Sequence, residues 1–161
     1  MSPKLFPARV LALPALLLPA LLLIAAAPPP TPHTLSVTVT NVRNATGHVR
    51  IDLCTRDQFL TDHCGWHGEA MAHPGTTTVT VTGVPAGRYA VQAYHDENDN
   101  HDVDRAFLGI PKEGIGFSND APASFGPPSW DKARFDMGGD TSIQLKMRYM
   151  LGAGGAPTGR H

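Results

Sequence analysis

The sequence has no excess of charge of either sign. Thirteen Lys and Arg residues stand against fourteen Asp and Glu residues, which gives a formal net charge of −1. A protein that binds nucleic acid normally presents a basic face, and this balance argues against such a partner. The sequence also lacks a phosphate-binding glycine loop, and after residue 27 it has no apolar run long enough to span a membrane.

The one long apolar run lies at the N-terminus. This run spans residues 10–27 and follows two basic residues, Lys4 and Arg9. It ends in three alanines at 25–27, a small-residue pattern typical of a cleaved secretory signal. Two prolines within the run disfavour the alternative, an uncleaved membrane anchor. We therefore expect a signal peptide at 1–27, a Pro-rich linker at 28–33 and a periplasmic or secreted protein. Its eleven basic and fourteen acidic residues would give a net charge of −3.

Cysteine is scarce, with only Cys54 and Cys64. In an exported protein, two cysteines this close in sequence favour a disulfide, which contributes about 2–3 kcal/mol by restricting the unfolded chain. Metal ligation is the alternative, because His63, His67 and His73 lie nearby and imidazole suits copper or zinc. We favour a solvated histidine-bearing loop over such a metal site.

Alternating apolar and polar residues, which are typical of half-buried strands, dominate the rest of the chain. The alternation predicts strands at 34–40, 48–54, 76–82, 88–95, 133–137 and 141–149. We expect the first two strands to form a β-hairpin, because the residues between them are rich in Asn, Thr and Gly. The segments 55–75 and 106–131 show little alternation and are predicted to be irregular.

These strands, with almost no helical periodicity, predict an all-β fold. We expect an antiparallel β-sandwich of about seven strands at 34–149, followed by a disordered tail at 150–161. The turn at 85–87, which leads into an aromatic strand, resembles that of transthyretin-like or prealbumin-like sandwiches. That analogy concerns the fold and implies no activity.

An acidic loop follows the predicted strand at 88–95. Its oxygen-bearing side chains occupy every second position: Asp96, Asn98, Asn100, Asp102 and Asp104. This spacing resembles the start of a calcium loop, in which residue 102 would supply its backbone carbonyl. The twelfth position is Phe107 rather than a bidentate Glu, so we expect an affinity of only ~10⁻⁴–10⁻³ M and no other cofactor. The alternative is a solvated turn, whose side chains bond nearby backbone groups.

The segment from Leu108 to Trp130 is too long for a simple connector, and its aromatic residues argue for order. We expect this Gly/Pro-rich loop to cap one end of the sandwich. In the alternative interpretation this loop and the acidic loop form a ligand cleft that includes Glu113 and Phe117, and an exposed Trp130 stacks on a glycan or peptide. A cell-envelope glycan or protein would then be the partner.

Catalysis has little support in the sequence. Ser118 lacks the final glycine of a G-x-S-x-G motif, and the C-terminus lacks the tetrapeptide of a transthyretin-like hydrolase. A small hydrolase centred on His95, Asp96 and Glu113 is the remaining alternative. We expect a non-enzymatic binding or cell-envelope role, with calcium as a stabilising candidate.

Four motifs occur in order in the second half of the chain: 94–98 (YHDEN), 108–114 (LGIPKEG), 116–119 (GFSN) and 127–131 (PPSWD). Together they resemble the bacterial secreted family catalogued as domain of unknown function 2141, over about residues 34–149. The family's usual loop is similar to H-D-E-N-x-N-G-x-x-D, often with glycine after the first Asn. Asp99 and His101 replace the two glycines here, and both residue types tolerate positive φ better than most. The resemblance implies no settled activity.

Overall fold

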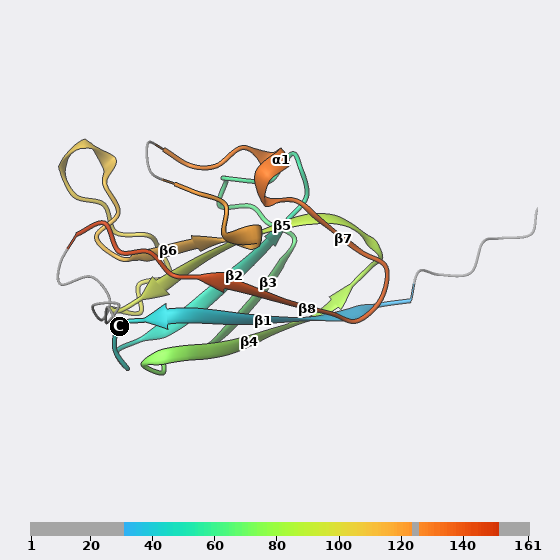
Figure 1. The fold of residues 1–161 in the computed structure, drawn as a ribbon, viewed down its shortest axis with the longest axis horizontal. Helices are drawn as coiled ribbons and strands as arrows, with labels where there is room; N and C mark the ends of the chain where they lie inside the picture. The colour runs from blue at the N-terminus through green and yellow to red at the C-terminus, as the bar shows by residue number, and fades with distance from the viewer. Residues whose placement is uncertain (1–30, 124–125, 152–161) are drawn as a thin grey trace, which may run out of the picture.

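The computed structural model describes residues 31–123 and 126–151, so the expected signal peptide and almost all of the expected tail lie outside it. The described chain forms two packed β-sheets (Figure 1). Its strands are β1 (His33–Val42), β2 (His48–Cys54), β3 (Trp66–Met71), β4 (Gly75–Val84), β5 (Gly87–Asp96), β6 (Gly114–Phe117), β7 (Phe135–Met137) and β8 (Thr141–Lys146). Three short helical segments accompany them: η1 (Phe107–Gly109), η2 (Ser118–Asp120) and α1 (Trp130–Ala133).

The first sheet has the strand order β4-β1-β8, and the second has β3-β2-β5-β6 with β7 also paired to β5. The predicted all-β sandwich is therefore confirmed. One pair departs from the antiparallel expectation, because β1 and β8 run parallel. Within the described residues no helix has the length and apolar character needed to cross a bilayer.

The core fills the space between the two sheets. Alternating strand residues supply it, and burying each large side chain stabilises the fold by about 1.5–3 kcal/mol. The fully buried Leu, Ile and Val residues are Leu35, Val37, Val39, Val49, Ile51, Leu53, Val79, Val84, Val91 and Leu145. The period-two pattern of the sequence thus marks the inward face of each strand.

Glycine lets the two sheets approach each other along both edges. A Cβ on Gly68 of β3 would lie 2.7 Å from the Thr80 carbonyl oxygen of β4. At the opposite edge, a Cβ on Gly116 of β6 would lie 2.7 Å from Leu145 Cδ1 of β8. A larger residue at position 68 would meet the backbone of β4, and one at position 116 would displace the Leu145 side chain.

The predicted hairpin between 34–40 and 48–54 is wrong. β1 pairs with β4 and β8, whereas β2 pairs with β3 and β5, so the two strands lie in different sheets. Asn41, at φ 62°, ends the regular pairing of β1 and donates its amide to the Met147 carbonyl at 2.7 Å. This contact joins residues more than a hundred positions apart, and local turn chemistry does not reveal it.

Two strands lie in segments that were expected to be irregular. β3 falls within 55–75 and β6 within 106–131. Both carry glycine at inward positions, Gly68 in β3 and Gly114 and Gly116 in β6, where an alternating strand normally has an apolar side chain. The close packing that requires these glycines also removes the apolar signal that would have predicted the strands.

The Cys54–Cys64 disulfide is confirmed, with Cα atoms 4.6 Å apart. It lies in a second buried cluster, in which Phe59 packs edge-on against Phe117 and Trp130. This cluster is where the long Gly/Pro-rich segment covers one end of the second sheet. The disulfide therefore fastens the covering segment as well as the end of β2.

We predict that replacing both cysteines by alanine lowers the free energy of unfolding by about 3 kcal/mol, because the unfolded chain regains the freedom of a short loop. Urea unfolding of the oxidised chain and the Cys54→Ala/Cys64→Ala variant measures the difference. Reducing agent should destabilise the natural chain and leave the variant unaffected. Equal stability of the two proteins would contradict the prediction.

Candidate functional site

The acidic loop, residues 96–104, is built around one buried carboxylate. The Asp96 side chain is fully buried and accepts a hydrogen bond from Arg50 Nε at 2.6 Å. The backbone N–H groups of Asn100 and His101 donate to its two oxygens at 3.1 and 2.9 Å. Asp96 thus links β2, in the middle of the second sheet, to the turn that follows β5.

These contacts determine the ionisation of Asp96. Burial by itself would raise the pKa of this carboxyl group. Hydrogen bonds from Arg50 and from the His101 and Asn100 amides, together with the Arg50 charge, outweigh burial and hold the pKa below its ordinary value. Asp96 is therefore a charged, fully partnered group at neutral pH.

Two residues of the loop adopt the left-handed backbone conformation, Asp99 at φ 56° and His101 at φ 64°. These are the two positions at which the family's usual loop has glycine. The tolerance of Asp and His for this conformation explains how the loop turns without glycine. Arg50 secures the turn further, because its Nη2 lies 3.6 Å from Asp99 Oδ1 and 3.4 Å from His101 Nε2.

Glu113 holds the two ends of the acidic loop together. It is 4% exposed, and its carboxylate accepts hydrogen bonds from the backbone N–H groups of Glu97 at 3.0 Å and Asp104 at 3.3 Å. Burial raises the pKa of Glu113, and the neighbouring charges of Asp96 and Asp104 add to the rise. The residue therefore acts as a clamp on the backbone.

The five proposed calcium ligands do not form one cage of oxygens. Asp96 faces Arg50, and Asp102 accepts a hydrogen bond from the next backbone amide. Asn98 and Asn100 direct their amide nitrogens to the Asp104 carboxylate, at 2.9 and 3.4 Å. Among the described residues, no three His, Cys, Asp or Glu side chains are grouped as a metal site. Calcium binding stays a prediction.

The three residues of the hydrolase alternative point in different directions. His95 is fully buried between the sheets, where its Nδ1 lies 2.8 Å from Tyr149 Oη and its Nε2 lies 2.8 Å from the Thr46 carbonyl. Since a carbonyl only accepts, Nε2 carries the proton. Asp96 lies on the opposite face of β5, and Glu113 is occupied by backbone amides.

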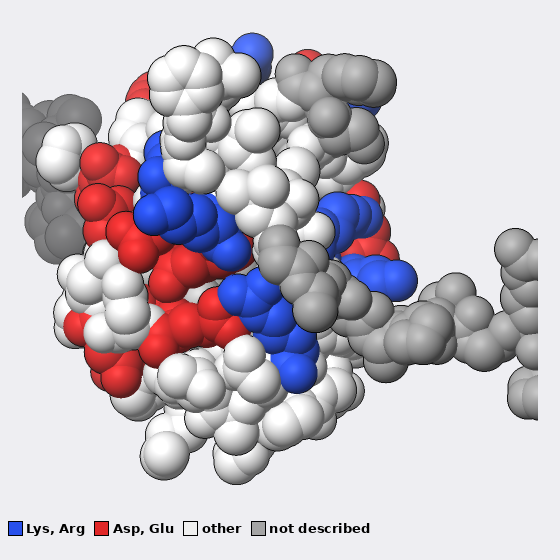
Figure 2. Space-filling model, turned by 90° about the vertical axis from the view of Figure 1, so that its left-hand side faces the viewer, with Lys and Arg blue, Asp and Glu red and all other residues white. Residues whose placement is uncertain are grey.

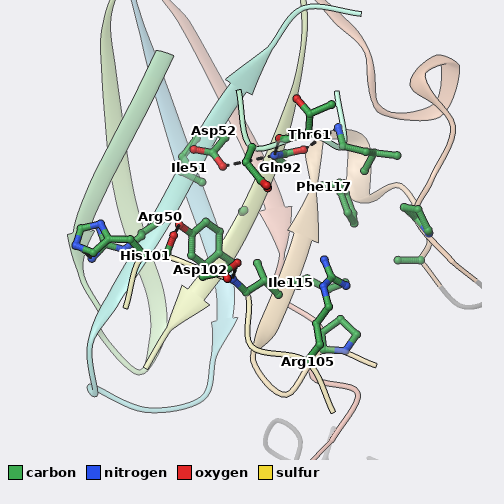
Figure 3. Close-up of a pocket in the computed structure, with 18 of the residues that line it drawn as sticks. Arg50, Ile51, Asp52, Thr61, Gln92, His101, Asp102, Arg105, Ile115 and Phe117 are labelled. Carbon is green, nitrogen blue, oxygen red and sulfur yellow. Dashed lines mark hydrogen bonds between the residues drawn. The ribbon is translucent and has the colours of Figure 1, made fainter. Parts of the chain in front are cut away.

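A groove of about 1200 Å³ opens on the outer face of the second sheet (Figure 3). Two rows of side chains cross its floor, following the register of the four strands. In order from β3 to β6, one row is Glu69, Arg50, Tyr94 and Ile115, and the other is His67, Asp52, Gln92 and Phe117. The floor therefore changes from ionic at β3 and β2 to apolar at β6.

Loops from three regions of the chain wall the groove. Leu60, Thr61 and Asp62 form one wall, the acidic loop contributes residues 101–103, and residues 108–111 add an apolar rim. Gln92 fixes the first wall, because its side chain accepts from Leu60 N at 3.0 Å and donates to Thr61 O at 2.9 Å (Figure 3). The acidic loop thus serves as one wall of a larger site.

Glu113, Phe117 and Trp130 do not line one open cleft. Phe117 lines the groove, whereas Glu113 and Trp130 do not. Trp130 is half-buried and packs on Phe59, 5.7 Å between ring centroids. It helps to cover the second cluster and is not an open stacking surface.

Sequence reasoning missed Arg50 and the polar floor. The available signal was the polar residues at alternate positions of β2 and β5, on the face away from the core: Arg50, Asp52, Gln92 and Tyr94. Such residues are ordinarily solvated and carry no functional information. Only the pairing of the strands and the walls around them mark these four as the base of a groove.

We predict that Asp96→Asn lowers the free energy of unfolding by about 3 kcal/mol at pH 7, because Arg50 loses a buried carboxylate partner. A carboxyl group whose pKa is lower in the folded chain stabilises above its unfolded pKa of about 3.9, and this contribution is lost as pH falls through the folded value. The difference between the two proteins should therefore shrink below about pH 4.

Urea unfolding from pH 7 to pH 3 measures this effect. Asp136→Asn is the control, because Asp136 forms an exposed pair with Arg88 and its loss should change stability little. If the two variants are equally stable at pH 7, Asp96 does not hold the loop as described.

A family model for an "uncharacterized protein conserved in bacteria (DUF2141)" matches residues 37–144. The match extends from β1 into β8 and includes the acidic loop and all four strands of the groove floor. No curated protein and no solved structure shows significant similarity to the chain. The family resemblance of the sequence motifs is confirmed, and the chain belongs to the bacterial family of uncharacterised proteins known as domain of unknown function 2141.

Proposed function

We propose that this protein is a non-catalytic binding module that holds a short extended peptide of a cell-envelope protein in the groove. The observation that carries the proposal is the graded floor, ionic at Glu69 and Arg50 and apolar at Ile115 and Phe117. A ligand that matches it needs both polar and apolar side chains. The groove is larger than most small-molecule sites, which measure about 300–1000 Å³.

The dimensions of the floor suit a peptide. Four neighbouring strands give three spacings of about 4.8 Å, or roughly 14 Å from β3 to β6. An extended chain covers about 3.3 Å per residue, so about four or five residues would cross the floor. Alternate side chains of such a peptide would face the sheet and meet the two rows of floor residues.

The charges of the groove favour a basic residue in that peptide. Four carboxylates line the groove: Asp52, Asp62, Glu69 and Asp102. Against them stand the guanidinium groups of Arg50 and Arg105, and Arg50 is already paired with Asp96 and Glu69. A Lys or Arg side chain would share the carboxylates of Glu69 and Asp52, which face Arg50 and His67, while apolar side chains would lie toward β6.

A glycan suits the groove less well. Sugar rings are held by open aromatic faces, and Trp130 packs against Phe59 outside the groove. Phe117 is 6% exposed, and the Tyr94 hydroxyl donates to the His101 carbonyl at 3.3 Å. The apolar half of the groove consists mainly of aliphatic side chains, which complement those of a peptide.

Selection from a displayed library of random peptides should yield sequences that combine Lys or Arg with aliphatic residues. For such a peptide, followed by fluorescence anisotropy, Leu60→Asn and Glu69→Lys should each weaken binding about tenfold, equivalent to about 1.4 kcal/mol. Leu60 is 44% exposed at φ 67°, a conformation that Asn accepts, so this variant should fold.

Thr78→Asp, on the exposed face of β4 in the other sheet, is the matched control and should bind like the natural chain. Peptides that bind all three variants equally would place the site elsewhere. A selection that enriches no peptide would contradict the proposed ligand class.

We keep calcium as a second proposal, limited to the outer part of the acidic loop. The observation in its favour is that Asn98 and Asn100 converge on the Asp104 carboxylate. Both amide groups would have to turn so that oxygen faces the cation. Their oxygens now accept backbone hydrogen bonds from Asn100 and Asp102, so we expect an affinity no tighter than ~10⁻³ M.

Calcium at tenfold its dissociation constant should stabilise the chain by about 1.4 kcal/mol, and magnesium should not. A thermal melt of the chelator-treated protein, with each cation in turn, measures the shift. Asp104→Asn should abolish the shift and Asp136→Asn should preserve it. Overlapping curves would leave the loop with a structural role alone.

A further inference from the structure

The loop from Arg105 to Pro111, called here the tip loop, presents two uncovered apolar side chains. Phe107 is 87% exposed and Leu108 is 82% exposed. The tip loop is the gold segment that projects at the upper left of Figure 1, just before the start of β6. Nothing else in the described part of the chain covers these two side chains.

The tip loop is an ordered small hairpin. Arg105 and Pro111 pair as an isolated bridge, and Ala106 N donates to the Ile110 carbonyl at 2.7 Å. Leu108 has φ 66°, which is a rare conformation for a bulky residue. Such conformations persist where the surrounding structure enforces them, and they concentrate at binding and switch sites. The hairpin thus holds Phe107 and Leu108 outward at its apex.

Basic residues flank the apex of the tip loop in the sequence. Arg105 and Lys112 are both exposed, and no acidic residue lies between them. The flanking acids are turned inward: Asp104 is half-buried beside Asn98 and Asn100, and Glu113 is buried. Figure 2 shows this end of the molecule, where Lys and Arg side chains lie beside an uncharged projecting surface and a patch of Asp and Glu side chains lies next to them. An apolar apex above exposed basic residues is complementary to an anionic lipid surface.

The small size of the apex argues against a second copy of the chain as its occupant. A stable protein interface buries about 800 Å² on each partner. Phe107 and Leu108 together supply roughly 300–400 Å². A membrane surface requires only that a few apolar side chains reach the boundary between headgroups and acyl chains.

We propose that the tip loop docks the protein on membranes rich in anionic phospholipid, with Phe107 and Leu108 inserted at the interface and Arg105 and Lys112 at the headgroups. This inference rests on the tip loop and holds for any groove ligand.

A tryptophan reporter tests the proposal at the tip itself, whatever else in the chain contacts lipid. The full chain carrying Phe107→Trp is mixed with vesicles of phosphatidylglycerol and phosphatidylcholine that contain brominated lipid, and its fluorescence is compared with that of the natural chain. The fluorescence emission of tryptophan at position 107 should shift to shorter wavelength and be quenched by the brominated lipid. Met71→Trp is the matched control, because Met71 is 67% exposed on the edge strand β3, and it should not be quenched.

Affinity variants complete the experiment. In the Phe107→Trp background, Leu108→Ser should weaken vesicle binding about tenfold. The pair Arg105→Gln and Lys112→Gln should weaken it by about fivefold for each charge.

Three results would overturn the proposal: no quenching at position 107, equal quenching by vesicles of phosphatidylcholine alone, or a spectral change that follows protein concentration without vesicles. The last would mark the apex as a contact between copies of the chain.

Discussion

The buried contact between Arg50 and Asp96 is the interaction on which the rest of this end of the molecule depends. Arg50 stands in the middle of the second sheet with its side chain 8% exposed, where a guanidinium group without a carboxylate would be costly. Asp96 supplies that carboxylate and also accepts hydrogen bonds from the backbone amides of Asn100 and His101. The sheet and the loop therefore stabilise each other.

The groove and the tip loop both follow from this arrangement. Asp96 and Glu113 hold the acidic loop in place, and the loop forms one wall of the groove. The tip loop begins directly after it, at Arg105. Much of the loop's acidity is used internally, in contacts with Arg50 and with backbone amides. Arg105 and Lys112, which flank the apex of the tip loop, are nevertheless basic and exposed.

Most strands could be predicted because one face of each strand is buried in the core. Leu35, Val37 and Val39 alternate with polar residues, and all three are fully buried. The disulfide could be predicted from the spacing of two cysteines, and the turn at Asp99 and His101 from the residue types that tolerate positive φ. The strands around Gly68 and Gly116 could not, because close packing between sheets removes the side chains that would have made a pattern.

By itself, the sequence determined the all-β class, the inward face of the principal strands, the disulfide and the family, since each depends on neighbouring residues or on short motifs. Tertiary structure decided that β1 and β2 lie in different sheets, that Asp96 faces Arg50 and that Trp130 packs inward. It also placed Glu69, Asp52, Gln92 and Ile115 on one floor. These outcomes depend on strand order and on contacts between residues far apart in the chain, which no local pattern encodes.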